Sequence, residues 1–140
     1  MKNQLFALIG LGLLLATASA YAQTGVVKAK VPFNFIVNKT QVSAGQYLIH
    51  PLGTMNSGAM TLESSDRKVV MAFLPNACES SQPPQTTKLV FHRYGEQYFL
   101  AQIWSAGNER GHELPKTEQE REVAMSYPAP QDVVVVATLR

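Results

Sequence analysis

The stretch that decides the fold is Lys88-Leu-Val-Phe-His-Arg-Tyr-Gly-Glu-Gln-Tyr-Phe-Leu-Ala-Gln-Ile-Trp104. Two runs rich in aromatic and β-branched residues flank Gly95-Glu96, and glycine at the first central position is typical of a two-residue type II′ turn. The sequence therefore predicts a tight β-hairpin with Arg93 opposite Tyr98. Continuing that register places Phe91 opposite Leu100.

The register of this hairpin predicts which side chains share a face, because successive residues of a strand point to opposite sides. One face is expected to carry Leu89, Phe91, Tyr98, Leu100 and Trp104. The other is expected to carry Val90, His92, Phe99, Ala101 and Ile103.

Upstream of the hairpin, residues 31–37 alternate between apolar and more polar positions and predict a strand with one buried face. Pro32 cannot donate to a ladder, so this strand is expected to begin there or to lie at a sheet edge. A turn at Ser43-Ala-Gly45 leads into a second predicted strand, residues 46–52, with Tyr47 and Ile49 on one face. We expect these two strands to pair.

Residues 68–74 predict a further strand, and its run from residue 69 to residue 74 is apolar at both parities, which predicts that both faces are covered. Residues 75–84 contain Pro, Ser and Asn and are expected to form an exposed loop. Residues 133–139 predict a last β-branched strand, and residues 133–136 are apolar enough to allow edge-to-edge assembly with another copy.

Residues 115–125 form the one convincing helical segment. Thr117 with Glu120 predicts a capping box, and the helix is expected to dock through Val123 and Met125. Its glutamates, Glu120 included, are expected to form a solvated acidic surface rather than a catalytic pair.

Together these segments predict an all-β fold, mainly an antiparallel sandwich or a partly open barrel of six to seven strands, with one short C-terminal helix. A parallel α/β fold is excluded because no crossover helices separate the strands.

Residues 1–22 read as a signal peptide: cationic Lys2, an apolar run from Leu5 to Ala16, and the cleavage pattern Ala20-Tyr21-Ala22. We expect a product made of residues 23–140, a single β-rich domain exported to the periplasm or the extracellular space. The membrane is then involved only through the cleaved leader.

The chain of 140 residues has 12 Lys and Arg and 10 Asp and Glu, so loss of Lys2 lowers the net charge from +2 to +1. This balance argues against nucleic acid as the main partner. Cys78 is the single cysteine and cannot form an intrachain disulfide. Its thiol is expected to be buried or inert, with intermolecular pairing as the alternative.

The sequence contains no G-x-S-x-G, H-E-x-x-H or C-x-x-C motif and no phosphate-binding glycine loop. We therefore predict no catalytic residues, no metal ligands and no cofactor. The alternative is a hydrolase or metal-dependent enzyme whose active-site residues come from separate loops. His112 and Glu113 are the first candidates for such a site.

The candidate binding residues belong to the hairpin and are His92, Arg93, Tyr94, Tyr98 and Trp104. If these rings are exposed, they would form a platform for a sugar or a partner strand, because Tyr and Trp combine contact area with a polar group. If they are buried, they would cover the core under the helix. The first alternative predicts a non-enzymatic binding or structural module of the cell envelope, with an envelope protein or a glycan as partner and an oligomeric state that the sequence leaves open.

Several segments together resemble a family of small exported bacterial proteins of unknown function. They are Val31-Pro-Phe-Asn-Phe-Ile-Val37, Ser43-Ala-Gly-Gln-Tyr47, Lys88-Leu-Val-Phe-His-Arg-Tyr-Gly95, Gln97-Tyr-Phe-Leu100, Glu113-Leu-Pro-Lys116 and Glu120-Arg-Glu122. Members typically have Pro where Ser43 stands. The resemblance implies a secreted β-rich domain and brings no known activity or site residue.

Overall fold

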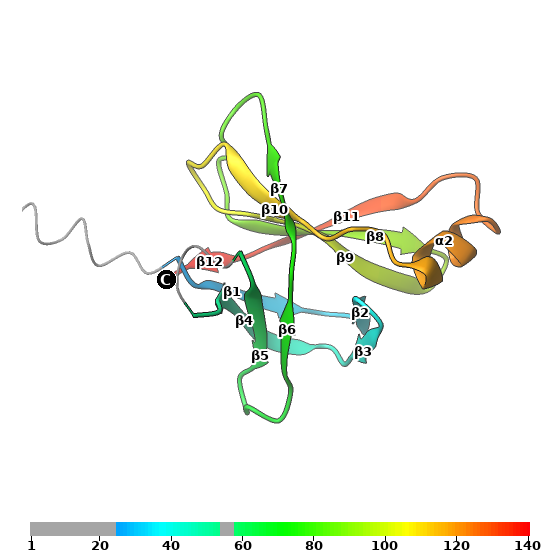
Figure 1. Cartoon of the computed structure of the whole chain (residues 1–140), viewed down its shortest axis with the longest axis horizontal. Coiled ribbons are helices and arrows are strands. Elements are labelled where there is room, and N and C mark those ends of the chain that lie inside the picture. The colour runs from blue at the N-terminus through cyan, green and yellow to red at the C-terminus, as the bar shows by residue number, and fades with distance from the viewer. Residues whose placement is uncertain (1–24, 54–57) are drawn as a thin grey trace, which may run out of the picture.

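The computed structural model describes residues 25–53 and 58–140 (Figure 1). The predicted signal peptide lies outside these residues. Two sheets face each other, and no helix in the described ranges is long and apolar enough to cross a membrane.

The smaller sheet has five strands in the order β12-β1-β4-β5-β6, all antiparallel. Its strands are β1 (Val27–Val31), β4 (Gly45–Pro51), β5 (Met60–Ser64), β6 (Val70–Phe73) and β12 (Thr138–Leu139).

The larger sheet has the order β11-β8-β9-β10-β7, with β2 pairing parallel to β9 and β3 pairing with β2. Its strands are β2 (Phe35–Val37), β3 (Thr40–Val42), β7 (Asn76–Glu79), β8 (Lys88–Tyr94), β9 (Gln97–Trp104), β10 (Arg110–Glu113) and β11 (Gln131–Val136). Helix α2 (Glu118–Ala124) follows β10.

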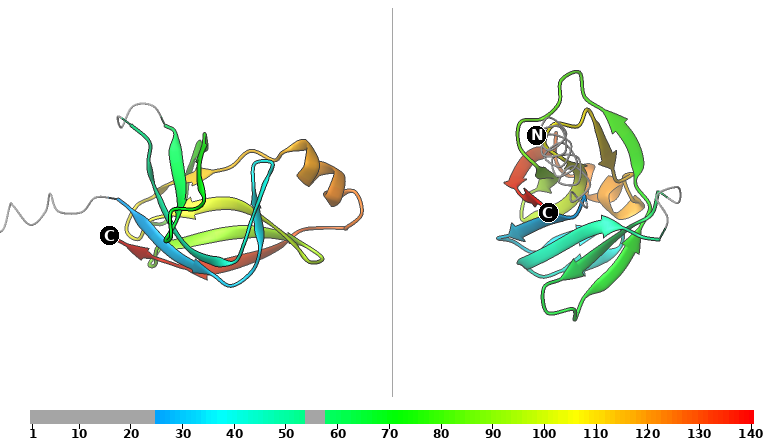
Figure 2. Two further views of the ribbon diagram at one scale, coloured as in Figure 1. Left: turned by 90° about the horizontal axis from the view of Figure 1, so that it is seen from below. Right: turned by 90° about the vertical axis from the view of Figure 1, so that its left-hand side faces the viewer.

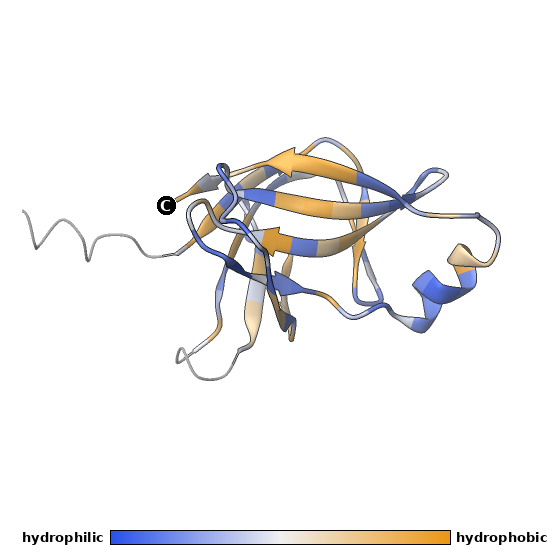
Figure 3. Cartoon of the chain, turned by 90° about the horizontal axis from the view of Figure 1, so that it is seen from above, coloured by the Kyte–Doolittle hydropathy of each residue, from blue (hydrophilic) through white to orange (hydrophobic). Residues whose placement is uncertain are grey.

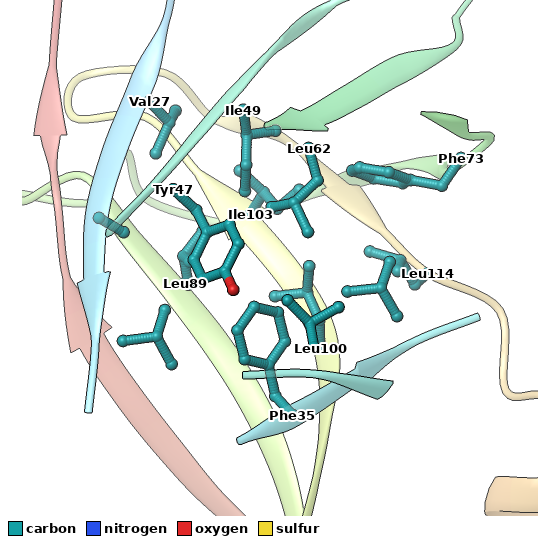
Figure 4. Packing of buried hydrophobic residues seen from close by; sticks show 14 of the residues in the cluster. Val27, Phe35, Tyr47, Ile49, Leu62, Phe73, Leu89, Leu100, Ile103 and Leu114 are labelled. Atoms are coloured by element: carbon teal, nitrogen blue, oxygen red, sulfur yellow. The ribbon is translucent and has the colours of Figure 1, made fainter. Parts of the chain in front are cut away.

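One apolar core lies between the sheets and draws on both (Figure 4). Ile49 and Leu62 come from the smaller sheet and Phe91, Leu100 and Ile103 from the larger, each at most 3% exposed. The predicted all-β sandwich with one late helix is therefore confirmed. The described residues form twelve strands rather than six to seven, because short strands replace several predicted loops and two predicted strands are each divided in two.

The chain passes between the sheets at four places in its described part: residues 32–34, 43–44, 74–75 and 137. Pro32 and Pro75 lie at two of these crossings. Proline has no backbone N–H to donate, and because the pairing of strands ends at a crossing, no hydrogen bond between strands is lost there. Asn34 ties two crossings together, because its Oδ1 accepts from the Ala44 N–H at 2.9 Å.

The prediction of one strand over residues 31–37 is wrong. β1 ends at Val31 and β2 begins at Phe35 in the other sheet, so β1 pairs with β4 whereas β2 pairs with β3. The apolar alternation persists because both pieces contribute to the same core. Tyr47 and Ile49 share the buried face as predicted.

The β8–β9 hairpin confirms the predicted turn and corrects the faces beyond it. Arg93 lies opposite Tyr98, Phe91 lies opposite Leu100, and Gly95 has a φ of 61°. A register shift between Val90 and Phe91 then pairs Leu89 with Ile103. This bulge turns Ile103 into the core and Trp104 to the outer face, the reverse of the prediction.

Residues 68–84 also differ from expectation. β6 is an edge strand whose Val70 is 61% exposed, and Leu74, which follows it, is 65% exposed, so the segment is not covered on both faces. The predicted loop contains β7, which pairs with β10 and holds the half-buried Cys78 opposite Gly111.

The last predicted strand is present as β11 and β12, which join the edges of the two sheets. β11 pairs with β8 and β12 pairs with β1. Val133 and Val135 pack on the core, whereas Val134 and Val136 are exposed.

Trp104 covers one end of the outer face of the larger sheet, where its indole lies over Gly111. A Cβ added to Gly111 would lie 2.5 Å from Trp104 Cε3, so the glycine makes room for the indole. We expect Gly111→Ala to lower the free energy of unfolding by about 1–3 kcal/mol, measured by urea denaturation, because the ring has to move.

Gly45→Ala is the matched control, since its added Cβ would meet only Tyr47 Cε2 at an ordinary 3.8 Å. It should change the stability by less than about 0.5 kcal/mol. Equal stabilities of the two variants would contradict this packing.

Candidate functional site

Polar side chains gather at the tip of the β8–β9 hairpin, where helix α2 and the β2–β3 hairpin meet it. Helix α2 lies at the end of the molecule opposite the C-terminus, as Figure 1 and the left view of Figure 2 show. Val123 and Ala124 of the helix pack on a small apolar cluster formed by Ile36, Tyr94 and Phe99. The hairpin's outer face is thereby covered at this end.

Helix α2 docks with few apolar residues, and most of its ribbon is hydrophilic (Figure 3). The Thr117 side chain caps it as predicted by accepting from the Glu120 N–H at 3.2 Å. Val123 docks as expected, but Met125 is 84% exposed, so its predicted docking role is wrong.

Glu120 is the main correction to the predicted acidic surface, because its side chain turns into the protein and is 5% exposed. The Tyr94 hydroxyl donates to Glu120 Oε2 at 2.9 Å, and His92 Nδ1 lies 3.1 Å from the same oxygen. Asp132 of β11 completes the group with Oδ1 3.8 Å from His92 Nε2. Three elements thus meet at one imidazole.

The surroundings of Glu120 shift its pKa in opposing directions. Burial raises the pKa, but hydrogen bonds from His92 and Tyr94 and the charges of His92 and Lys116 outweigh burial, so the pKa lies below its ordinary value. Burial, reinforced by Glu120, raises the pKa of Tyr94 to about 12. The phenol therefore stays protonated and acts as a donor to the carboxylate.

A polar pocket of about 180 Å³ opens beside this group, between the β2–β3 hairpin, the β8–β9 turn and the start of α2. Its lining residues are Asn34, Phe35, Ile36, Gln41, Glu96, Gln97, Tyr98 and Gln119. Four of these side chains are exposed amides, and none is cationic. The pocket therefore offers many neutral hydrogen-bond donors and acceptors around one aromatic ring.

A second, more open depression of about 530 Å³ adjoins the polar pocket and shares Glu96 and Gln97 with it. Tyr127 and Val123 lie on its helix side. A Cβ on Gly95 would overlap the Tyr127 hydroxyl, so the glycine lets the segment after the helix approach the turn.

The five candidate binding residues divide between the two faces of the hairpin. Tyr94 and Trp104 are 1% and 8% exposed, so they form no open platform. Tyr98 stacks on Phe33 with ring centroids 3.8 Å apart, and the Arg93 guanidinium lies 5.4 Å from the Tyr98 centroid.

Of those five residues, Tyr98 lines the polar pocket, and Tyr94 lies under the depression next to it. His92 holds Glu120, whereas Trp104 lies at the other end of β9 and donates to Gln102 Oε1 at 3.0 Å. The structure thus brings part of the predicted set to one place and leaves Trp104 outside it.

The residues suspected for an enzymatic alternative do not converge. His112 and Glu113 are adjacent in β10 and therefore point to opposite faces of the sheet. His112 is solvent-accessible, and the protein around its ring lowers its pKa by desolvation. Residues 25–53 and 58–140 contain no group of three or more side chains placed to hold a metal ion.

Comparison with protein-family models, with curated proteins and with solved structures finds no match to this chain. The resemblance drawn from the sequence motifs therefore stays a prediction.

Sequence reasoning missed Glu120 and the amides of the polar pocket. The amides come from three segments that are far apart in the chain, residues 34–41, 97 and 119, and each is an ordinary surface residue by itself. For Glu120 the available signal was its capping-box position, which predicts a side chain folded back on the helix rather than into the sheet.

The charge of Glu120 is expected to stabilise the fold. Because its pKa is lowered in the folded state, this contribution is present above the ordinary value of 4.5 and is lost as the pH falls through the folded pKa. Glu120→Gln should therefore lower the free energy of unfolding by about 1–2 kcal/mol at pH 7. In urea denaturation series, the difference from the wild type should narrow below pH 4.5.

Glu118→Gln is the control for this experiment, because Glu118 lies in the same first turn but is exposed. If both variants lose the same stability, or if the Glu120→Gln difference does not change with pH, the assigned role of Glu120 is wrong.

Proposed function

We propose that the chain is a small exported β domain that acts by binding, and that its polar pocket takes a neutral sugar unit of an envelope glycan. The observation that carries the proposal is the lining of this pocket, in which exposed amides surround the buried Phe35 and Ile36 and the half-buried Tyr98. Hydroxyl groups of a sugar are recognised by such donors and acceptors. Phe33 stacks on the Tyr98 ring and Arg93 lies over it, so Tyr98 offers the pocket its edge rather than a ring face.

The charge of the pocket supports a neutral ligand over an anionic one. Its single charged lining residue is Glu96, a carboxylate that would repel an anion. A volume of about 180 Å³ suits one ring rather than a peptide segment. Among the two partners expected from the sequence, these features favour a glycan over an envelope protein.

The pocket is also held firmly, which reduces the entropic cost of binding. Asn34 is fixed by the bond from Ala44, and Gln119 lies next to the anchored Glu120. The β8–β9 turn is restrained by Arg93 Nε, which donates to the Gly95 carbonyl at 2.7 Å. A preformed pocket of this kind suits recognition of a ligand that gives weak individual contacts.

The test is a titration of the isotope-labelled protein with maltotriose, cellotriose and triacetylchitotriose, followed by amide chemical shifts. At least one sugar should shift signals of residues 34–41 and 96–98. Gln97→Ala and Gln119→Ala should each weaken that binding by about five- to tenfold, because each removes one hydrogen-bonding group.

Gln85→Ala serves as the matched control, since Gln85 is an exposed amide in the loop before β8 and lines neither this pocket nor its neighbour. It should leave the sugar affinity unchanged. Absence of shifts at the pocket with all three sugars, or equal effects of Gln85→Ala and Gln97→Ala, would overturn the proposal.

Export is tested separately by N-terminal sequencing of the protein recovered from outside the cytoplasm. The pattern Ala20-Tyr21-Ala22 predicts that the product begins at Gln23. A cytoplasmic product that retains Met1 would contradict the proposed location, and this result would have no bearing on the proposed binding of a sugar.

A further inference from the structure

The outer surface of the smaller sheet carries a groove with a chemistry opposite to that of the polar pocket. Two adjoining hollows of about 200 and about 380 Å³ share Lys28 and Gln46. The first is completed by Tyr47, Leu48, Ser65 and Arg140, and the second by Lys30, Val136, Ala137 and Thr138. Strand β12 and the start of β1, which contribute Thr138 and Lys28 to this basic groove, lie near the C-terminus, whereas α2 lies at the other end of the molecule (Figure 1).

The pleat of β1 places the two lysines of the groove side by side. Val27, Ala29 and Val31 point into the core and are at most 2% exposed. Lys28 and Lys30 alternate with them and therefore both point outward, about 7 Å apart along the strand. Their spacing is a direct result of the core pattern.

The positive charge of the two lysines is not neutralised locally. Within the described part of the chain, neither Lys28 nor Lys30 has an acidic group within 4.0 Å. Glu63, an acid on the same face of this sheet, is 3.3 Å from Arg67 Nε and 3.5 Å from His50 Nε2. Within the described residues, the groove therefore presents the ammonium groups of Lys28 and Lys30 to solvent without an acidic partner, whereas the neighbouring acid Glu63 has partners.

We propose that the basic groove binds an acidic glycan chain through its carboxylate groups. Lys28 and Lys30 would each meet one carboxylate, while the amide of Gln46 and the hydroxyls of Ser65 and Thr138 suit sugar hydroxyls. Leu48, Val136 and Ala137 provide an apolar floor for the sugar rings. This second site does not depend on the neutral-sugar pocket.

The shape of the site favours a chain over an anionic membrane. Its cations lie within two hollows, and a flat bilayer would contact raised surfaces before it reached them. An extended chain can lie along the groove and contact both lysines together. The hydrogen-bonding side chains of the lining also match hydroxyl groups better than a lipid surface.

The experiment measures the affinity of the purified mature protein for an oligogalacturonide by calorimetry at low ionic strength. Binding should weaken as NaCl is raised, because the contacts are between charges. Lys28→Ala and Lys30→Ala should each reduce the affinity by about tenfold or more. Lys28→Arg and Lys30→Arg, which keep the charge, should bind within about threefold of the wild type.

Lys39→Ala is the matched control, because Lys39 is an exposed lysine in the turn between β2 and β3 and its loss changes the net charge equally. It should leave the affinity unchanged. Gln97→Ala should also leave it unchanged, which separates this site from the neutral-sugar pocket.

Three results would overturn the basic-groove proposal. They are no binding of the oligogalacturonide, an equal loss of affinity in Lys39→Ala, and tighter binding to phosphatidylglycerol vesicles than to the oligosaccharide. Circular dichroism of each variant distinguishes a lost contact from a lost fold. If an alanine variant fails to fold, the arginine variants still test whether binding depends on the positive charge at these two positions.

Discussion

The β8–β9 hairpin is apolar on both faces, and the rest of the molecule is arranged to cover both. Leu89, Phe91, Leu100 and Ile103 face the smaller sheet, which buries them completely. On the outer face, helix α2 covers Tyr94 and Phe99 at one end, while Trp104 covers Gly111 at the other. A sandwich alone would leave this second face in water. The need to cover it explains why a β domain of this size retains one helix next to its largest strands.

Helix α2 covers the hairpin with little apolar surface. Hydrogen bonds to a buried carboxylate therefore add to the hydrophobic packing that holds the helix in place. Seven residues form few intrahelical hydrogen bonds, and only Val123 and Ala124 pack on the cluster below. Glu120 adds a charged acceptor that Tyr94 and His92 both contact. Burial of a carboxylate is unfavourable unless its oxygens are bonded. Here the bonds reach across to β8, so Glu120, a residue of the first turn of the helix, also orients the helix over the hairpin turn.

The sequence predicts the hairpin well because its turn is local: Gly95-Glu96 sets the register, and the alternation of the strands does the rest. The errors come from features that adjacent residues do not reveal. The bulge between Val90 and Phe91 exchanges Ile103 and Trp104 between the faces of the hairpin. At Pro32 the chain leaves one sheet for the other, although the alternation of apolar residues continues. The polar pocket has no local signature, since Gln41, Gln97 and Gln119 meet only through the pairing of β2 with β9 and the docking of α2.

The two proposed sites differ in charge because different constraints shape the surfaces that carry them. At the hairpin tip, the surface forms where loops and a helix start converge, and its side chains are neutral amides with one carboxylate. On the smaller sheet, alternation along β1 forces Lys28 and Lys30 to share one face, since the residues between them are needed in the core. A net charge near zero therefore conceals two regions of different character. Because the linings of the two regions share no residue, a neutral sugar at one and an acidic chain at the other can be held together without competing for the same side chains.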